Sequence, residues 1–173
     1  MRRGWWTGVV LLVAVILLVA RAWERERMDS ASAPEGAGPG ESVQARVTGV
    51  TDGDTIDVEI DGEHENVRYI GIDTPESSSG RPLECFGHEA TAANERLVGG
   101  RVVTLTFGPE LRDRYDRLLA YVRRDGLFVN AELVERGFAR SLTISPNDQF
   151  APLLERLERE AGRAARGLWG ACA

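Results

Sequence analysis

Lysine is absent from this chain of 173 residues, so its 21 basic residues are all arginines. Acidic residues outnumber them at 27, and the formal net charge is −6. Residues 1–40 hold four acidic residues and five arginines, so the rest of the chain carries 23 acidic and 16 basic residues and a net charge of −7. A domain with this charge is not a general binder of polyanions, and a site for one would need a local arginine cluster or a bound cation.

Cysteine and histidine are scarce, with two residues of each. Cys85 and Cys172 lack a matching histidine cluster, which excludes a zinc site. If the two cysteines pair, the disulfide closes a long loop, ties the C-terminus down and stabilises the fold by about 4–5 kcal/mol in the loop-entropy model. Two unrelated buried thiols are the alternative. His64 and His88 are expected at the surface, neither as ligands nor as bases.

One long apolar run stands at the N-terminus. Residues 9–20 are uninterrupted, and the run from residue 5 to residue 20 reaches 16 residues. This is slightly short for a membrane span of about 17–25 residues and long for a signal-peptide core of about 7–15. Residues 1–28 are expected to be a secretory signal peptide, with an Ala-Arg-Ala cleavage pattern at 20–22, or an uncleaved N-terminal transmembrane anchor. Both alternatives place the rest of the chain outside the cytoplasm, secreted or anchored to the cytoplasmic membrane.

Residues 29–41 are rich in Ser, Ala, Pro and Gly and are expected to be a flexible linker. Residues 42–173 then form one domain of usual size. Five strands interleaved with three helices predict an α+β fold that is mainly β, a small barrel with helices packed on it. Asn130 is expected to cap the second helix. Helices are predicted at residues 87–98, 131–136 and 148–166, and strands in a hairpin over residues 52–76 and at 43–50, 101–107 and 118–122.

The hairpin over residues 52–76 has two alternating apolar runs around a polar linker. Pairing Ile60 with Val67 puts the apolar side chains on one face, and the same register sets Asp54 opposite Asp73. Opposed residues have Cβ atoms about 4.5–5.5 Å apart, and two carboxylates that close repel unless a cation lies between them or one is protonated. Hard divalent cations prefer carboxylate and carbonyl oxygens, so the hairpin suggests a metal site. Either acidic segment alone is equally consistent with an ordinary turn.

Arg68 and Glu76 lie near the open end of this hairpin. Arg68 has the opposite strand parity from Asp73, so simple pleating sends the two side chains to opposite faces. A bulge or strong curl between them, at a residue such as Gly71, is therefore required if both serve one site.

An ordered set of motifs carries a family resemblance. The set is Val50-Thr51-Asp52-Gly53-Asp54-Thr55, Val67-Arg68-Tyr69-Ile70-Gly71-Ile72-Asp73-Thr74-Pro75-Glu76, Phe86-Gly87-His88-Glu89-Ala90, Asp113-Arg114-Tyr115-Asp116-Arg117-Leu118-Leu119-Ala120-Tyr121, and Val129-Asn130 through Leu133-Val134 to Gly137-Phe138-Ala139.

Together these motifs resemble the staphylococcal-nuclease-like family, also called thermonucleases, over about residues 43–170. The resemblance implies a five-stranded OB-fold barrel with three helices, a fold that commonly binds nucleic acids. It also implies a monomeric, calcium-dependent nuclease. Such an enzyme would hydrolyse single-stranded or open DNA and RNA with low sequence specificity and leave 3′-phosphorylated ends.

The resemblance implies a calcium site. Asp54 and Asp73 are similar to the family's direct Ca²⁺ ligands, with the backbone carbonyl of Thr74 as a third and Asp52 in the outer shell. Calcium held by two carboxylates can polarise a phosphate and position water.

The resemblance also implies residues that act on the phosphate. Arg68 and Arg117 match the two arginines that grip the scissile phosphate, and Glu76 matches the carboxylate that activates the attacking water. Arg114 and Tyr115 match the contacts to the nucleotide's terminal phosphate or sugar. Arginine offers an always-charged planar fork that fits phosphate oxygens, and a carboxylate within reach of water can accept its proton. The arginine pair makes the site locally cationic in an acidic domain.

Two places depart from the family pattern. Asp116 stands where the family has Gly, which suggests a left-handed backbone position and adds a negative charge beside Arg117. Residues 142–146 lack the Tyr that stacks on the nucleotide base, and Thr143 falls near that position. Base stacking contributes about 1–3 kcal/mol per base, so weaker or less selective binding is expected.

Two functions other than catalysis stay open. One is an inactive OB-fold module that binds nucleic acid or a protein partner while tethered to the cell envelope. The other, on fold analogy alone, is a tethered barrel that binds oligosaccharide or peptide. The enzyme is favoured because its acidic ligands and arginines are all present: Asp54, Asp73, Glu76, Arg68 and Arg117.

Overall fold

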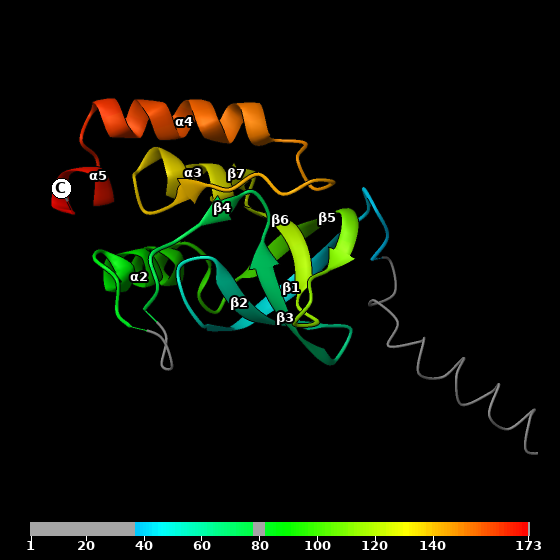
Figure 1. The fold of residues 1–173 in the computed structure, drawn as a ribbon. Coiled ribbons are helices and arrows are strands. Elements are labelled where there is room, and N and C mark those ends of the chain that lie inside the picture. The colour runs from blue at the N-terminus through cyan, green and yellow to red at the C-terminus, as the bar shows by residue number, and fades with distance from the viewer. Residues whose placement is uncertain (1–36, 78–81, 173) are drawn as a thin grey trace, which may run out of the picture. The chain divides into compact units, whose positions relative to one another are not determined.

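A closed five-stranded barrel forms the body of the protein in the computed structural model, which describes residues 37–77 and 82–172 (Figure 1). The strands lie in the order β3-β2-β1-β5-β6, and a parallel pairing of β3 with β6 closes the ring. This arrangement confirms the predicted α+β fold, an OB-fold barrel with three packed helices. The barrel strands are β1 (Ser42–Val50), β2 (Thr55–Ile60), β3 (Glu63–Tyr69), β5 (Val102–Arg112) and β6 (Leu118–Arg124).

Shorter elements complete the fold. A two-residue strand pairs antiparallel with the end of β6, and two others pair with each other in a small separate sheet. Helix α4 lies along α3, and both pack at the same end of the barrel, while α2 covers another side (Figure 1). The short helix α5 was not predicted. These elements are β4 (Ile72–Asp73), β7 (Leu127–Phe128), β8 (Arg140–Ser141), α2 (Gly87–Val98), α3 (Val129–Glu135), α4 (Ala151–Arg163) and α5 (Leu168–Ala171).

The predicted export segment, residues 1–28, lies outside the described residues, as does most of the predicted linker. Residues 37–41 are described and lead into β1, and the Gly40 amide donates a hydrogen bond to the Phe107 carbonyl at 2.9 Å. Within the described part of the chain, no helix is long and apolar enough to cross a membrane.

Alternating side chains on β2 fill the barrel interior. Ile56, Val58 and Ile60 are buried, whereas Asp57 and Glu59 between them are exposed. A half-buried strand requires this period of two, because successive side chains point to opposite faces. The alternation therefore fixes which face of the hairpin meets the core.

The predicted hairpin register is wrong. Ile60 pairs with Glu63, and Val67 pairs with Ile56, so Asp54 does not lie opposite Asp73 in the ladder. Asp61 and Gly62 form a two-residue turn, with φ of 51° and 87°. Two successive positive φ values are typical of the tight hairpin turn that matches strand twist, and that turn sets the register. The error is four residues, an even number, so the apolar side chains keep their face and the pattern cannot distinguish the two registers.

The predicted curl at Gly71 is confirmed. β3 ends at Tyr69, and Gly71 takes a φ of 81° before the chain enters β4, which pairs with β8 in the separate sheet. A Cβ on Gly71 would also lie 2.6 Å from Cδ1 of Leu154. Glycine is needed at this position for its backbone conformation and for the close approach of α4.

Asn130 does not cap α3 as expected, because it lies one residue inside the helix and is buried. Its Oδ1 accepts a hydrogen bond from the Val122 amide at 2.9 Å, and its Nδ2 donates to the Ile70 carbonyl at 2.8 Å. The side chain therefore ties α3 both to β6 and to the chain just before the curl.

Cys85 and Cys172 form a disulfide, as expected. Their Cα atoms are 5.9 Å apart, although the residues are 87 positions apart in the sequence. The bond joins the segment before α2 to the residue after α5 and so fastens the C-terminus to the body.

Candidate active site

All nine residues predicted for the site line one polar cavity of about 460 Å³. They reach it from the loop before β2, the end of β3, the segment from β4 to residue 76, and the loop between β5 and β6. A second cavity of about 480 Å³ adjoins the first, since both are lined by Arg68, Arg114, Tyr115 and Arg117. The nine residues are Asp52, Asp54, Arg68, Asp73, Thr74, Glu76, Arg114, Tyr115 and Arg117.

Arg68 joins the carboxylates of Asp54 and Asp73, which were predicted to be neighbours. Its Nη1 lies 2.9 Å from Oδ1 of Asp54, and its Nη2 lies 2.8 Å from Oδ1 of Asp73. Nη1 also donates to the carbonyls of Tyr69 and Ile72, at 3.2 and 2.9 Å, so the chain that curls at Gly71 wraps around the guanidinium. Asp54 and Asp73 are thus neighbours through the curl and through Arg68, not through the strand ladder.

Asp54 is the buried member of the pair, with 4 % of its surface exposed. The Thr74 amide and hydroxyl both donate to its Oδ2, at 2.7 and 3.0 Å, and the Thr55 hydroxyl donates to its Oδ1. Asp52 accepts a hydrogen bond from the Asp54 amide and so shapes the turn that presents this carboxylate. The turn and the segment after β4 therefore hold Asp54 from two sides.

Burial raises the pKa of the Asp54 carboxyl from its ordinary value of 3.8 to about 7. The Arg68 cation and the Thr74 hydrogen bonds lower the pKa, and the nearby Asp52 carboxylate raises it further, so burial prevails. A bound cation would favour the ionised form of such a group.

The donor atoms suit a hard divalent cation. Asp54, Asp73 and the Thr74 carbonyl offer only oxygen atoms as ligands. Ca²⁺ in proteins is bound by six to eight oxygen atoms. Two carboxylates and one carbonyl leave places for water and phosphate oxygens. Among the described residues, no three His, Cys, Asp or Glu side chains converge as a ready-made metal cluster. The chemistry of the donors fits Ca²⁺, with part of the coordination shell left to substrate and solvent.

The loop at residues 113–117 carries the second arginine. Asp113 Oδ2 accepts from Nε and Nη2 of Arg117 at 2.8 and 2.6 Å, and Asp113 Oδ1 accepts from the Tyr115 and Arg117 amides. Partial burial acts to raise the pKa of Asp113, but these hydrogen bonds outweigh it and the pKa is lowered. Sequence reasoning missed this role of Asp113, whose spacing of four from Arg117 was the available signal.

Asp116, in the same loop, has a φ of 65°, which confirms the predicted left-handed backbone position.

Tyr115 is the platform of a small cationic cluster, and 58 % of its surface is exposed. The guanidinium carbons of Arg114 and Arg117 lie 4.7 and 5.4 Å from the centre of its ring, and Arg114 donates to its hydroxyl at 2.7 Å. Cation–π contacts of this kind keep flexible arginines near a ring that faces the cavity.

Glu76 lies half-buried at the end of the polar cavity. Its amide donates to Oε2 of Glu84 at 3.2 Å, and its carbonyl accepts from the Glu84 amide at 2.9 Å. Gly87, at the start of α2, packs so closely that a Cβ there would lie 2.3 Å from the Glu76 carbonyl oxygen. The backbone that presents the Glu76 carboxylate is therefore fixed by the chain just before α2.

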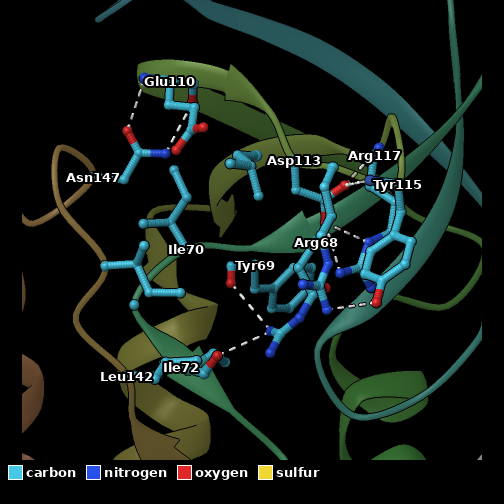
Figure 2. Close-up of a pocket in the computed structure, with 14 residues that line it drawn as sticks. Arg68, Tyr69, Ile70, Ile72, Glu110, Asp113, Tyr115, Arg117, Leu142 and Asn147 are labelled. Atoms are coloured by element: carbon cyan, nitrogen blue, oxygen red, sulfur yellow. Dashed lines mark hydrogen bonds and ion pairs between the residues drawn. The ribbon is translucent and has the colours of Figure 1, made fainter.

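The second cavity has an apolar wall (Figure 2). Leu142 and Ile144 line it with 38 % and 58 % of their surfaces exposed, whereas Thr143 is not one of the described residues that line it. Asn147 braces this wall, since its side-chain amide accepts from the Glu110 amide and donates to the Glu110 carbonyl.

Comparison with known proteins agrees with this barrel and cavity. Residues 66–171 match the family model described as staphylococcal nuclease homologue. The chain is 32 % identical over 164 residues to the thermonuclease of Staphylococcus hyicus, covering 94 % of this chain and 96 % of that protein. It is 32 % identical over 165 residues to the thermonuclease of Staphylococcus intermedius, with the same coverage of both proteins.

A third relative is the SPbeta prophage-derived endonuclease YokF of Bacillus subtilis (strain 168), 36 % identical over 134 residues, which are 75 % of this chain and 45 % of that protein. The fold and the site thus define an OB-fold barrel with a polar cavity that brings two arginines, Arg68 and Arg117, close to the carboxylates of Asp54 and Asp73. The chain belongs to the staphylococcal nuclease homologue family.

Proposed function

We propose that this chain, a nuclease by its family, is a calcium-dependent phosphodiesterase that hydrolyses DNA and RNA with low sequence specificity. The observation that carries the proposal is the convergence of two carboxylates, two arginines and Glu76 on one polar cavity. These are the groups that phosphodiester hydrolysis requires: a metal site, a clamp for phosphate oxygens and a base for water.

Asp54, Asp73 and the Thr74 carbonyl would hold Ca²⁺. When bound, the ion supplies a Lewis acid that polarises a phosphate oxygen and positions water. Thr74 contributes to Asp54 as well, because its amide and hydroxyl orient the carboxylate. Asp52 acts one step further out, through the Asp54 amide.

Arg68 and Arg117 grip the scissile phosphate. They border both cavities, so a phosphate held between them lies where the polar and the apolar cavity meet. Each guanidinium is bound by carboxylates in the structure, Arg68 by Asp54 and Asp73 and Arg117 by Asp113. These contacts hold the side chains in place before the substrate arrives, and phosphate oxygens are a competing acceptor of the same geometry.

Glu76 takes a proton from the attacking water. The water oxygen forms a bond to phosphorus, and the bond from phosphorus to the 5′ oxygen of the next nucleotide breaks. The leaving oxygen takes up a proton and becomes a 5′-hydroxyl, and the phosphate stays on the 3′ end. Arg68 and Arg117 stabilise the charge that builds up on the phosphate oxygens in the transition state.

The apolar cavity receives a base, with Arg114 and Tyr115 contacting the terminal phosphate or sugar. Leu142 and Ile144 carry no hydrogen-bonding groups, and the Asn147 amide is engaged by the Glu110 backbone. A wall of this kind contacts any base without reading its edge, which supports low sequence specificity. Such a base must be splayed out of a duplex, so single-stranded or open DNA and RNA are the proposed substrates.

An extracytoplasmic location also belongs to the proposal, with the chain secreted or anchored to the cytoplasmic membrane through residues 1–28 and acting as a monomer. The Cys85–Cys172 disulfide supports it, because disulfides persist in oxidising compartments. The N-terminal amino acid of the mature protein would show whether the segment is a cleaved signal peptide or an anchor.

The purified full chain, incubated with single-stranded DNA or RNA and with Ca²⁺ or a chelator, tests the proposal. Digestion with Ca²⁺ and not with chelator is expected, and the products should accept a polymerase only after phosphatase treatment. If no divalent ion supports digestion, the nuclease mechanism is rejected. Tight binding without cleavage would favour the inactive nucleic-acid-binding module.

A further inference from the structure

We propose that Arg112 is a positioning residue for Arg117, and that with Glu65 it clamps the loop at residues 113–117 in its active conformation. The inference rests on the proposed function, which assigns Arg117 to the scissile phosphate. Of the described residues that line the two cavities, neither Arg112 nor Glu65 is one, so they act through the loop.

The clamp begins with a bidentate ion pair. Nη1 and Nη2 of Arg112 donate to Oε2 and Oε1 of Glu65 at 3.0 and 2.7 Å. Arg112 is the last residue of β5, and Glu65 lies on β3, three residues before Arg68. Both side chains are mostly buried, and paired forks of this kind hold a defined geometry. The pair therefore fixes the base of the loop to the strand that carries the other phosphate-binding arginine.

The same guanidinium reaches the far side of the loop. Nη1 of Arg112 donates to the Asp116 carbonyl at 2.7 Å, and that carbonyl belongs to the peptide group leading directly into Arg117. Asp116 takes a φ of 65°, where a residue with a Cβ has less intrinsic preference than glycine. The hydrogen bond from Arg112 supplies from outside the stabilisation that a glycine would provide by itself.

Charge gives Arg112 a second task. The Asp116 carboxylate is exposed and directly precedes Arg117 in the chain, so it adds a negative charge next to the arginine proposed to bind phosphate. Nε of Arg112 lies 3.6 Å from Oδ1 of Asp116 and offsets part of this charge, because the same guanidinium is also paired with Glu65. Asp116, Arg112 and Glu65 thus form one network. Arg112 stabilises the left-handed backbone at Asp116 and reduces the effect of its negative charge, and Glu65 holds Arg112 in position.

Arg112→Met and Glu65→Gln test the clamp in the full chain, with kcat and KM measured on single-stranded DNA with Ca²⁺. Misplacing Arg117 should lower kcat about 10- to 100-fold, with a smaller change in KM, because the clamp sets transition-state geometry. Adding Asp116→Gly to Arg112→Met should restore most of kcat, because glycine adopts the left-handed conformation unaided. Arg156→Met is the matched control, since Arg156 pairs with Glu160 on α4 and should leave kcat unchanged.

A kcat within twofold of the wild type in Arg112→Met, or no recovery on adding Asp116→Gly, overturns the inference. If Arg112→Met does not fold, Glu65→Gln decides by the same kcat criterion. Hydrogen exchange gives a readout that needs no activity: the amides of Asp113 and Asp116, which close the loop, should exchange faster in Glu65→Gln. Unchanged exchange there overturns the clamp, whereas an inactive wild type with faster exchange in the variant counts against the proposed function alone.

Discussion

The Arg117 guanidinium lies against the Asp113 carboxylate, with Nε and Nη2 at 2.8 and 2.6 Å from the same oxygen. The other oxygen of Asp113 accepts two backbone amides of the loop. One side chain therefore folds the loop and aims the arginine that the loop carries.

Asp113→Asn should lower kcat and the free energy of unfolding together, because the amide cannot form the charged pair with Arg117. The lowered pKa of Asp113 sets the pH dependence. At neutral pH the carboxylate contributes stability, and this contribution is lost as the pH falls below about 4 and through the lowered pKa. Denaturant unfolding should show the wild-type advantage over Asp113→Asn at pH 6 and a smaller advantage at pH 3. An advantage that grows with acid would contradict the assignment.

Glu76→Gln and Arg117→Ala should each lower turnover about 100- to 1,000-fold, the usual effect of removing one preorganised catalytic group. Glu76→Gln should keep the wild-type melting temperature within a few degrees, whereas Arg117→Ala should lower it because the pair with Asp113 is lost. Arg156→Ala, on the exposed surface of α4, is the control for generic loss of an arginine. Near-normal turnover in either site variant would remove that residue from the mechanism.

Calcium should raise the melting temperature of the wild type, because a ligand that binds only the native state stabilises it. Asp54→Asn should abolish this response to Ca²⁺, since Asp54 is the buried carboxylate of the donor set. Calorimetry with and without chelator measures the effect independently of catalysis. A calcium-induced shift that survives in Asp54→Asn would move the metal site elsewhere.

Reductant should destabilise the protein by about 4–5 kcal/mol, which corresponds to a fall in melting temperature on the order of 10–20 °C. Activity should fall as well, because Cys85 adjoins Glu84, whose carboxylate and amide hold the Glu76 backbone. A variant with Cys85→Ser and Cys172→Ser should melt at the same temperature as the reduced wild type, and reductant should not change that temperature. Unchanged melting of the wild type under reductant would count against the stabilising role.

Ile144→Tyr should lower KM for single-stranded DNA by roughly tenfold, because an aromatic ring on the cavity wall adds base stacking of about 1–3 kcal/mol. Thr143→Tyr is the matched control, since that side chain lies outside the lining of the cavity. Equal effects of the two substitutions would show that the wall does not contact the base.

Strand alternation was sufficient for the barrel, and the family resemblance of the ordered motifs was sufficient for the residues that line the polar cavity. Strand alternation marks the core, and the motif around Gly71 marks the curl that joins Arg68 to Asp73. The hairpin register was missed, because a slip of four residues leaves every side chain on the same face. The signal that fixes it was present in the sequence, since Asp61-Gly62 favours a two-residue turn with two positive φ values.

Contacts between distant segments were also beyond sequence reasoning. Asn130 is a residue type that commonly caps helices. In the structure its side-chain amide instead accepts a hydrogen bond from the Val122 amide of β6 and donates one to the Ile70 carbonyl. The Arg112–Glu65 pair joins residues 47 positions apart, and neither residue belongs to a recognisable motif. Such partners follow from barrel closure, which no local pattern encodes.

The parallel pairing of β3 with β6 has a consequence for the timing of activity. It sets Arg68 beside Leu119, next to the residues that lead from Arg117, so the two arginines meet only when the ring is shut. A chain that has not yet folded contains both arginines but has not formed the site proposed to bind phosphate. Under the proposed export, a chain that crosses the membrane unfolded would gain its phosphate site only outside the cytoplasm, and the nucleic acids of the producing cell would be protected.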